Sequence, residues 1–356
     1  MALLPFSVVR ALAPEMRPLR ALVAGRWLRE AEVDALLGWL HPAWRLNRVM
    51  AQVIDREWVS DDLLALRLRG NGNLNGWQPG QHVQLYLELD GVRHCRSYSL
   101  TRVERDGVVE LGIRRQSGGF LSHHLLDHLA VGEVLELSQA QGELRWPEQA
   151  EGVGLLAAGS GITALLGLLR EALARGYTAP VTLLHYVREA GQRAYVAELQ
   201  GLMRRHANLQ VRWLLTGQGD GRFQPGHLQG LAGFALLACG PAGFVDAVRC
   251  GCTGALQSEA FSPLRRVSEP GQAVQLEFVR SRLQASGDSA SSLLEQAEAH
   301  GLRPAHGCRQ GICASCTCLL LGGAVRDLRS GAVSAEPGQA IRLCISAPLG
   351  DVRIDV

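Results

Sequence analysis

The sequence predicts a multidomain fold: an antiparallel β-barrel, then a doubly wound α/β domain, then a small α+β domain. Its length of 356 residues exceeds what a single hydrophobic core usually organises. Short, closely spaced strand patterns give way to strand–helix alternation, which is typical of a parallel sheet. A cysteine-rich segment near the carboxyl end marks a third unit.

The composition restricts both the chemistry and the location. All 36 basic residues are arginine, so any mechanism that needs a lysine, such as Schiff-base catalysis, is excluded. The 34 acidic residues leave a formal net charge of +2, which is too balanced for general nucleic-acid binding. No apolar run reaches the ~18 residues of a membrane-spanning helix, and the N-terminus lacks the cleavage site of a secretory signal. We therefore expect a cytoplasmic protein without a nucleic-acid partner.

Residues 1–47 are expected to form a helical N-terminal extension. Apolar residues recur there at close to helical spacing, and arginines outnumber acidic residues. The pattern favours a helix that packs on the next domain, with a helix that binds a membrane surface or a partner as the alternative. The recurring positions are Leu19, Leu22, Val23, Trp27, Leu28, Ala31, Leu36 and Leu40.

Residues 48–147 are expected to form the antiparallel barrel, with a sandwich as the alternative. Turn signals such as Asp90-Gly91 and Asp106-Gly107 separate short segments in which apolar and polar residues often alternate. The predicted strands are 51–54, 63–69, 82–89, 94–101, 108–114 and 134–137.

Residues 148–268 are expected to form the doubly wound domain, because strands and helices alternate there. Residues 258–270 carry two prolines and little periodicity, which favours a linker to the last unit. The predicted elements are strands 153–158, 181–187, 210–215 and 234–238, helices 162–175 and 195–206, and a further helix from Ala242.

Residues 272–356 are expected to form the small α+β domain. Strands are predicted at 274–279, 317–321 and 352–356, and a helix at 292–299. Ser289 or Ser291 is the expected cap at the start of this helix.

Four cysteines of this domain have the spacing C-x4-C-x2-C-x27-C, which is typical of a plant-type [2Fe–2S] cluster. Four thiolates must converge there on two iron atoms, and glycines in the loop allow it to fold closely around them. A structural zinc site is the alternative, but zinc sites favour two C-x2-C pairs and this chain has one. Cys318 is predicted to face away from the ligands as a buried thiol. The predicted metal ligands are Cys308, Cys313, Cys316 and Cys344.

This last domain resembles the plant-type ferredoxin domain, which has a β-grasp fold. Its eight arginines balance eight acidic residues, whereas strongly acidic free ferredoxins use their charge to find partners. The resemblance and the balanced charge together indicate a domain that receives electrons within its own chain.

Four further motifs precede this domain. Arg96-Ser97-Tyr98-Ser99 ends a predicted strand, and Gly118-Gly119-Phe120-Leu121-Ser122 opens a helix whose free amides suit a phosphate. Ala158-Gly159-Ser160-Gly161-Ile162-Thr163 joins a strand to a helix in the context where dinucleotides bind. Cys239-Gly240-Pro241 follows the last predicted strand of the α/β domain.

These motifs resemble the ferredoxin–NADP reductase superfamily, whose hallmarks are R-x-Y-[ST] and G-x-x-S. The resemblance implies that the barrel binds FAD, with FMN less favoured. It implies that Arg96 neutralises a flavin phosphate, that Tyr98 stacks on the isoalloxazine ring and that Ser99 hydrogen-bonds near its reactive nitrogen. The pyrophosphate would lie against Gly119 and Ser122. The flavin residues implied in this way are Arg96, Ser97, Tyr98, Ser99, Gly118, Gly119, Leu121 and Ser122.

The same resemblance implies an NAD(P)H site in the α/β domain. The glycine turn would bind the dinucleotide phosphates, and Cys239 would lie beside the nicotinamide ring. Tyr98, Ser99 and Cys239 are thus the expected catalytic residues. The residues implied at the dinucleotide site are Gly159, Gly161, Thr163, Cys239, Gly240 and Pro241.

The choice between NADPH and NADH depends on the residues after the second strand of the α/β domain. Arg188 and Arg193 stand there, where the adenosine ribose would lie. Arginine at this place favours the 2′-phosphate of NADPH, while NADH remains the alternative.

The order of the domains suggests a path for electrons from NAD(P)H through the flavin to the cluster. Reductases that this chain resembles serve oxygenases, hydroxylases and fatty-acid desaturases. The N-terminal extension, with Trp39-Leu40-His41-Pro42, resembles that of bacterial electron-transfer partners of membrane acyl desaturases. We therefore expect a desaturase as the acceptor and peripheral contact with the inner face of the membrane. A ring-hydroxylating or alkane/aromatic oxygenase is the alternative acceptor, and in either case we expect a di-iron or haem enzyme. A redox-sensing binding protein is an alternative of another class.

Overall fold

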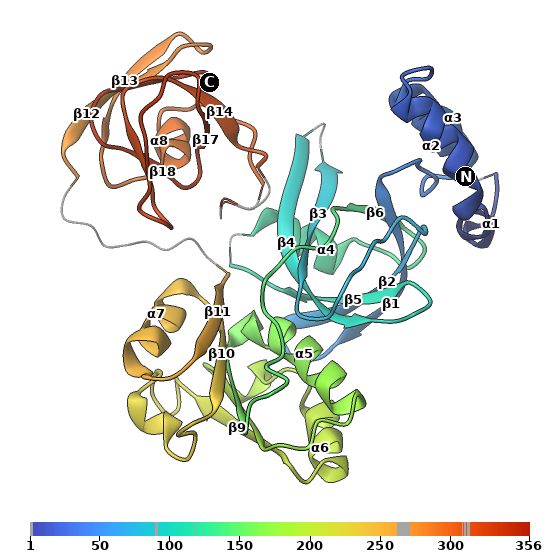
Figure 1. Ribbon diagram of the computed structural model, residues 1–356, viewed down its shortest axis with the longest axis vertical. Helices are drawn as coiled ribbons and strands as arrows, with labels where there is room; N and C mark the ends of the chain where they lie inside the picture. The colour runs from blue at the N-terminus through green and yellow to red at the C-terminus, as the bar shows by residue number, and fades with distance from the viewer. Residues whose placement is uncertain are drawn as a thin grey trace. The chain divides into compact units, whose positions relative to one another are not determined.

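The computed structural model describes residues 3–89, 92–117, 119–261, 271–307, 309, 311 and 314–356. It divides into two compact units, Met1–Glu259 and Ala260–Val356. The first unit holds the N-terminal helices, a closed barrel and a parallel sheet, and the second holds a mixed α+β fold (Figure 1). The predicted multidomain fold is confirmed.

The N-terminal extension is a small bundle of short helices. The predicted set of buried apolar residues is wrong in the last helix of the bundle. Leu36 is 72% exposed there, whereas Val33 and Leu37 face the core. The Asp34 carboxylate accepts a hydrogen bond from the Leu46 amide (2.7 Å), which ties this helix to the chain that enters the barrel. The elements are α1 (Phe6–Leu12), a 3-10 turn (Pro14–Met16), α2 (Arg17–Ala24) and α3 (Glu30–Leu40).

Six strands form a closed antiparallel barrel in the order β1-β2-β5-β4-β3-β6. Alternate residues fill its interior, as Val83 and Leu85 do on β3. Strand β1 is longer than predicted, because its polar second half continues to pair with β2 beyond a bulge between Val53 and Asp55. The strands are β1 (Val49–Trp58), β2 (Leu63–Gly70), β3 (His82–Leu89), β4 (Val92–Val103), β5 (Val108–Arg114) and β6 (Val134–Leu137), and α4 (Phe120–Asp127) packs on the barrel core.

A five-stranded sheet follows in the order β11-β10-β7-β8-β9, and its last four strands pair in parallel. The predicted linker is wrong at its start, because strand β11 extends to residue 260; residues 262–270 lie outside the described residues. The strands are β7 (Val153–Ala158), β8 (Val181–Val187), β9 (Leu209–Leu215), β10 (Ala235–Gly240) and β11 (Leu256–Ala260). The helices are α5 (Ile162–Ala174), α6 (Val196–Arg205) and α7 (Ala242–Gly251), with 3-10 turns at Gly159–Gly161, Ala190–Gln192 and Pro225–Leu228.

Helix α5 joins this sheet to the barrel. A Cβ atom at Gly167 would collide with the Leu100 carbonyl of β4, so the helix backbone lies directly against that strand. The Arg170 side chain, 11% exposed, binds Glu110 of β5 (2.9 Å) and Glu198 of α6 (2.7 Å). These buried ion pairs hold the barrel and the sheet together within the first unit.

The described residues of the second unit form two sheets, in the orders β13-β12-β19-β14-β17 and β16-β15-β18, and the helix α8. Ser292 caps this helix, because its hydroxyl accepts from the Glu295 amide and the Glu295 carboxylate accepts from the Ser292 amide (both 3.2 Å). The predicted cap at Ser289 or Ser291 is wrong; the Ser291 amide instead donates to Asp288 (2.6 Å) in the preceding turn. The elements are β12 (Ala273–Phe278), β13 (Leu283–Asp288), α8 (Leu293–Ala299), β14 (Thr317–Gly322), β15 (Val325–Asp327), β16 (Val333–Ser334), β17 (Ala340–Arg342), β18 (Ser346–Pro348) and β19 (Val352–Ile354).

Candidate functional site

Strand β4 carries the R-S-Y-S motif beside β3. Tyr98 packs against the barrel core, and burial raises the pKa of its phenol, so the ring stays neutral. Arg96 is half-buried and donates to the Cys95 carbonyl (2.7 Å). Ser99 is buried and lies opposite His82 in the strand pair. A neutral aromatic ring near an arginine fits a flavin that carries phosphate groups.

Several other residues of the predicted flavin site make bonds within the protein. The Ser97 hydroxyl accepts a hydrogen bond from the neighbouring strand β3 (2.7 Å). The Ser122 hydroxyl donates to the Gly119 carbonyl (3.0 Å), which closes the turn at the start of α4. Leu121 is buried in the barrel core, and Gly118 lies outside the described residues. The first turn of α4 therefore offers a phosphate its backbone amides, whereas the Leu121 side chain holds the helix on the barrel.

The glycine turn after β7 lies against the end of β10. Gly159 has a left-handed φ of +55°, and a Cβ atom at Gly161 would collide with the Cys239 carbonyl, so both positions need glycine. Thr163 is 2% exposed, and its hydroxyl donates to the Ser160 carbonyl (2.8 Å). Thr163 therefore stabilises the turn, and backbone amides are the groups that this turn can present to a phosphate.

Cys239 ends β10 and is fully buried. Burial, together with the nearby Glu259 carboxylate, raises the pKa of the Cys239 thiol well above its usual value, so the thiol stays protonated. A protonated thiol is a small polarisable surface and a poor nucleophile, which fits the predicted place beside a nicotinamide ring. Gly240 is buried as well, and the exposed Pro241 is the N-cap of α7.

His82 and Glu259 form a buried polar pair near this place, which the motifs did not indicate. His82 Nδ1 lies 3.0 Å from Glu259 Oε1. Among the described residues, His82 Nδ1 and Nε2 and Glu259 Oε2 are buried without a hydrogen-bond partner, so the 3.0 Å contact brings the two groups together without hydrogen-bond geometry. Because buried polar groups are nearly always hydrogen-bonded, these atoms indicate a bound ligand or water. The sequence places His82 at the start of the predicted strand 82–89 and Glu259 in the predicted linker 258–270, and neither position by itself indicates that the two side chains meet.

The loop after β8 holds both arginines that were predicted near the ribose. Arg188 is exposed and has no ion-pair partner in the described part of the chain, whereas the Arg193 Nε atom donates to the Ala190 carbonyl (2.9 Å). The Gln192 side chain accepts from the Arg188 amide (3.2 Å) and donates to Asp62 of the barrel (3.0 Å). The hydrogen bond from Gln192 to Asp62 thus ties the loop to the barrel, and among the described residues the Arg188 guanidinium has no ion-pair partner.

Cys316 and Cys344 lie together in the second unit. Their buried sulfur atoms are 3.3 Å apart, too far for a disulfide, and the Gly311 amide donates to Cys344 Sγ (3.2 Å). Paired sulfurs that accept an amide hydrogen bond fit an iron–sulfur cluster. The other two predicted ligands, Cys308 and Cys313, lie outside the described residues.

Cys318 does not face away from Cys316, so that prediction is wrong. It is half-buried and packs against the same core as Cys316, because residues two positions apart share one side of an extended chain. Burial raises the pKa of the Cys318 thiol to about 12, which keeps it protonated.

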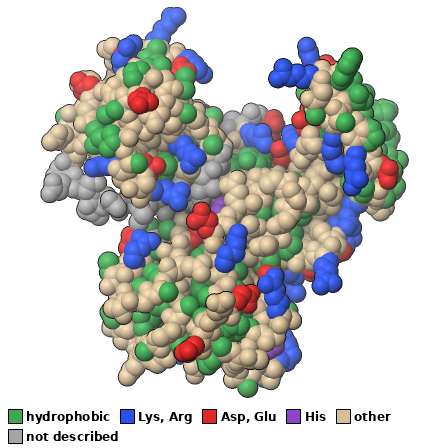
Figure 2. Space-filling model, in the orientation of Figure 1, with side chains coloured by type: hydrophobic (Ala, Val, Ile, Leu, Met, Phe, Trp, Pro, Cys, Tyr) green, Lys and Arg blue, Asp and Glu red, His purple; other side chains and the backbone are tan. Residues whose placement is uncertain are grey.

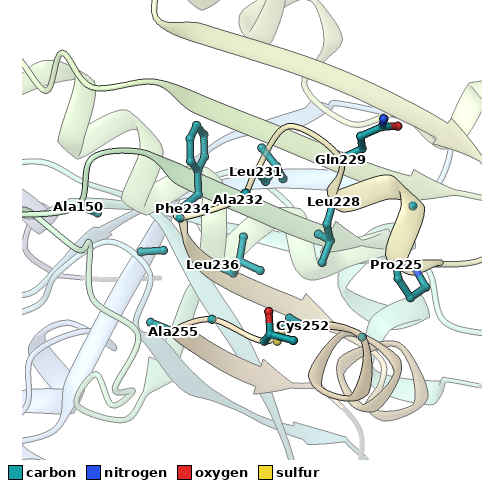
Figure 3. Close-up of a pocket in the computed structure, with 16 residues that line it drawn as sticks. Ala150, Pro225, Leu228, Gln229, Leu231, Ala232, Phe234, Leu236, Cys252 and Ala255 are labelled. Atoms are coloured by element: carbon teal, nitrogen blue, oxygen red, sulfur yellow. The ribbon is translucent and has the colours of Figure 1, made fainter.

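A surface hollow of about 810 Å³ lies at the other end of the parallel sheet, where β10 begins (Figure 3). Leu228, Leu231 and Phe234 line it, with Cys252 on the facing wall. None of the predicted site residues lines this hollow. It lies where β10 begins, whereas dinucleotides bind at the carboxyl ends of parallel strands, so it is distinct from the site described above.

Comparisons with known proteins decide the family. Residues 50–146 match the family model "Oxidoreductase FAD-binding domain", and residues 279–349 match "2Fe-2S iron-sulfur cluster binding domain". An "NADPH oxidoreductase" of Mycobacterium tuberculosis is 30% identical over 338 residues, with 91% of this chain and 88% of the relative covered. The chain belongs to the ferredoxin–NADP reductase family of flavoproteins with a C-terminal [2Fe–2S] domain.

Two further proteins are similar to this reductase. The "Heme-dependent oxidative N-demethylase beta subunit" of Ectopseudomonas mendocina is 32% identical over 292 residues, with 78% of this chain and 88% of that one covered. The solved structure of phthalate dioxygenase reductase superposes with a TM-score of 0.60 at 21% identity, covering 87% of this chain and 98% of that one. The reductase is an NAD(P)H-dependent oxidoreductase that uses FAD and a [2Fe–2S] cluster, and the predictions of these cofactors are confirmed.

Proposed function

We propose that this reductase passes electrons from NADPH through FAD and the [2Fe–2S] cluster to an oxygen-activating partner protein. The observation that carries the proposal is the presence in one chain of a glycine turn against Cys239 and of the paired sulfurs of Cys316 and Cys344. When bound, FAD supplies the redox chemistry that connects a donor of two electrons, as hydride, to a cluster that accepts one electron at a time. The protein would hold the flavin through Arg96, Tyr98 and the first turn of α4.

The proposed preference for NADPH rests on the Arg188 guanidinium. This side chain is exposed on the loop after β8 and has no ion-pair partner among the described residues. We expect Arg188→Gln to lower kcat/KM for NADPH about tenfold and to leave kcat/KM for NADH nearly unchanged, because only NADPH carries the 2′-phosphate. An equal loss with both nucleotides would contradict the preference.

A fatty-acid desaturase is the acceptor that we propose first, because the N-terminal extension with Trp39-Leu40-His41-Pro42 resembles that of bacterial electron-transfer partners of membrane acyl desaturases. A ring-hydroxylating or other haem or di-iron oxygenase is the second candidate. Two similar proteins favour this second candidate, because their names refer to an oxidative N-demethylase and to phthalate dioxygenase. Reconstitution of NADPH-driven turnover with a purified desaturase and with a purified oxygenase separates the two.

The electron path is tested with two artificial acceptors. Ferricyanide accepts electrons directly from a flavin, whereas cytochrome c is expected to depend on the cluster. We expect Cys313→Ser to abolish NADPH-driven reduction of cytochrome c and to leave ferricyanide reduction largely intact. Equal loss of both activities would contradict a linear path, and slow reduction of both acceptors by the fully loaded wild type would favour a redox sensor.

We also propose that the N-terminal bundle contacts a membrane surface. Trp27, Leu36 and Trp39 are 81%, 72% and 73% exposed, although the bundle has a core of its own. Arg26 and Arg29 are exposed beside Trp27 in the chain, and Figure 2 shows hydrophobic and arginine side chains together on the surface of this bundle. Exposed tryptophan with arginine is the composition of helices that lie in the membrane interface. Among the described residues, no helix has the length and apolar character needed to cross a membrane.

Vesicle binding tests this contact. We expect the protein to co-sediment with phosphatidylglycerol vesicles and far less with phosphatidylcholine vesicles, and we expect Trp27→Ala/Trp39→Ala to reduce the bound fraction severalfold. Trp58→Ala is the matched control, because Trp58 is 48% exposed on the barrel. Unchanged sedimentation of the double variant would remove the support for a membrane contact.

A further inference from the structure

The charges of the second unit are distributed unevenly around the predicted cluster. Residues 272–356 hold eight arginines and eight acidic residues. The two segments that carry the predicted cluster ligands, 303–318 and 338–349, nevertheless contain three arginines and no acidic residue. A domain of balanced charge is therefore positive around its cluster. The three arginines are Arg303, Arg309 and Arg342.

Arg342 lies against the loop that carries the cluster ligands. It is exposed, and its Nη1 atom donates to the Gly311 carbonyl. The Gly311 amide donates in turn to Cys344 Sγ (3.2 Å), one of the two paired sulfurs. A single residue of the loop thus separates this guanidinium from a ligand sulfur. In the described part of the chain, no carboxylate forms an ion pair with Arg342.

Arg303 places a second positive charge beside the cluster ligands. It is exposed, and it lines a hollow of about 290 Å³ together with Cys316 and Thr317. The Asp355 carboxylate is the acidic side chain that also lines this hollow, and it is paired with Arg280. Arg303 itself has no ion-pair partner among the described residues.

The third arginine, Arg309, is compensated within the unit. Its Nη1 atom lies 3.0 Å from Glu298 Oε2, and His306 Nδ1 lies 3.7 Å from the other oxygen of the same carboxylate. Arg303 and Arg342 are therefore the charges that a protein docked at these segments would meet without a compensating carboxylate.

We infer that the cluster surface, defined here by Arg303 and Arg342, docks an acidic surface of the protein that accepts the electrons. This inference rests on the proposed transfer of electrons from the cluster to a partner protein. Such transfer requires a close approach to the cluster, so it brings the surface of the partner onto these two guanidinium groups. Carboxylates on the partner would be attracted and would speed the encounter, whereas cations would be repelled. The resemblance to strongly acidic free ferredoxins would call for the opposite charge on the partner.

Reduction of two haem proteins of opposite charge tests this inference. The soluble haem domain of cytochrome b5 is acidic, and cytochrome c is basic. The FAD- and cluster-loaded protein is reduced with dithionite, freed of the excess and mixed with either haem protein in a stopped-flow instrument. At ~0.1 M salt we expect Arg303→Gln/Arg342→Gln to lower the second-order rate constant about fivefold with cytochrome b5 and to raise it with cytochrome c. Both effects should vanish at ~1 M salt, where the Debye length is only about 3 Å.

Arg303→Gln alone guards against damage to the cluster. It leaves the bond between Arg342 and the loop intact, so the reduced cluster should keep its paramagnetic signal. With one charge removed, we expect the rate constant with cytochrome b5 to fall about twofold at ~0.1 M salt.

Arg353→Gln is the matched control, because it removes the same charge at a distance from the cluster. Arg353 pairs with Gly322 at the last residue of β14, whereas Thr317, next to Cys316, is the first residue of that strand. At a rise of ~3.3 Å per residue the two ends of β14 lie about 16 Å apart, which exceeds the Debye length of about 10 Å at 0.1 M salt. The control should therefore change neither rate constant appreciably.

The outcomes separate this inference from the proposed function. Failure of the wild type to reduce its own cluster with NADPH would contradict the proposed function, whereas the docking test starts from dithionite-reduced protein and still applies. Equal rate constants of wild type and Arg303→Gln with cytochrome b5, or a fall with both haem proteins, would overturn the inference. Slower reduction of the cluster by NADPH in Arg303→Gln, with an unchanged rate toward cytochrome b5, would assign the cluster surface to the flavin-bearing unit of the same chain and would overturn it as well.

Discussion

Glu259 Oε1 lies 3.0 Å from His82 Nδ1, which joins β11 at the edge of the parallel sheet to the first residue of β3 in the barrel. The His82 side chain is 7% exposed and the Glu259 side chain 19%. Cys239 and Ser99 are the neighbours of this pair on β10 and β4, since Glu259 influences the Cys239 thiol and His82 pairs with Ser99. A buried histidine and a half-buried glutamate from different domains therefore meet where the two predicted cofactor sites adjoin.

We expect His82→Phe to lower the free energy of unfolding by about 1–3 kcal/mol, because it leaves a buried carboxylate without its partner. Glu259→Gln removes the charge, so the double variant should be less destabilised than the sum of the single variants. Urea unfolding of the FAD-loaded protein, followed by circular dichroism, measures these free energies. Strictly additive losses would show that the two side chains do not interact.

Arg170 is expected to contribute most of the ionic stabilisation between barrel and sheet. Arg170→Met leaves the Glu110 carboxylate, 8% exposed, with only the more distant Arg102 (3.8 Å) as a cation among the described residues, and we expect a loss of about 3–5 kcal/mol in urea unfolding. Arg175→Met, at the C-cap of the same helix, is the control. Arg175 is 61% exposed, so the loss of its ion pairs should cost less than about 0.5 kcal/mol. A small effect of Arg170→Met would mean that the two domains are held by apolar contacts alone.

Glu110 should make stability depend on pH on the acid side. Burial acts to raise the pKa of Glu110, but Arg170 and the Thr101 hydroxyl outweigh it and hold that pKa below its usual value. A carboxyl whose pKa is lower in the folded than in the unfolded state stabilises the fold above its unfolded pKa of about 4.3 and loses this contribution as pH falls through the folded pKa. The stability difference between wild type and Glu110→Gln should therefore be largest near neutral pH and shrink below about pH 4. A difference that stays constant between pH 7 and pH 3 in urea unfolding would contradict this assignment.

Substitution of a cluster ligand and of a non-ligand cysteine in the second unit should have opposite effects on the signal of the cluster. Cys344→Ser is expected to abolish the paramagnetic signal of the dithionite-reduced cluster, because it removes one of the two sulfurs that lie 3.3 Å apart. Cys318→Ser should keep that signal, since Cys318 is a protonated thiol on the strand that leaves the loop. Electron paramagnetic resonance of the anaerobically reduced proteins measures both. Loss of the signal in Cys318→Ser would require a different set of ligands.

The sequence by itself determined the order and type of most elements. The bounds of β3, β5, β7 and β8 agree with the predicted ones, because the alternating or continuous apolar pattern of each strand and the turn residues beside it are local features. The spacing of the cysteines likewise predicted that Cys316 and Cys344 meet, since a cluster leaves few ways to arrange its ligands.

Only the tertiary structure decided which neighbouring faces are buried and which distant side chains meet. Val33 and Leu37, rather than Leu36, face the core of the N-terminal bundle, because α3 contacts the segment that carries Trp44 and Leu46. The pairing of His82 with Glu259 and the approach of Arg114 to Gly159 depend in the same way on how the barrel packs against the sheet. Periodicity and spacing record how each residue relates to its neighbours along the chain, whereas these contacts join segments that only the packing of complete domains brings together.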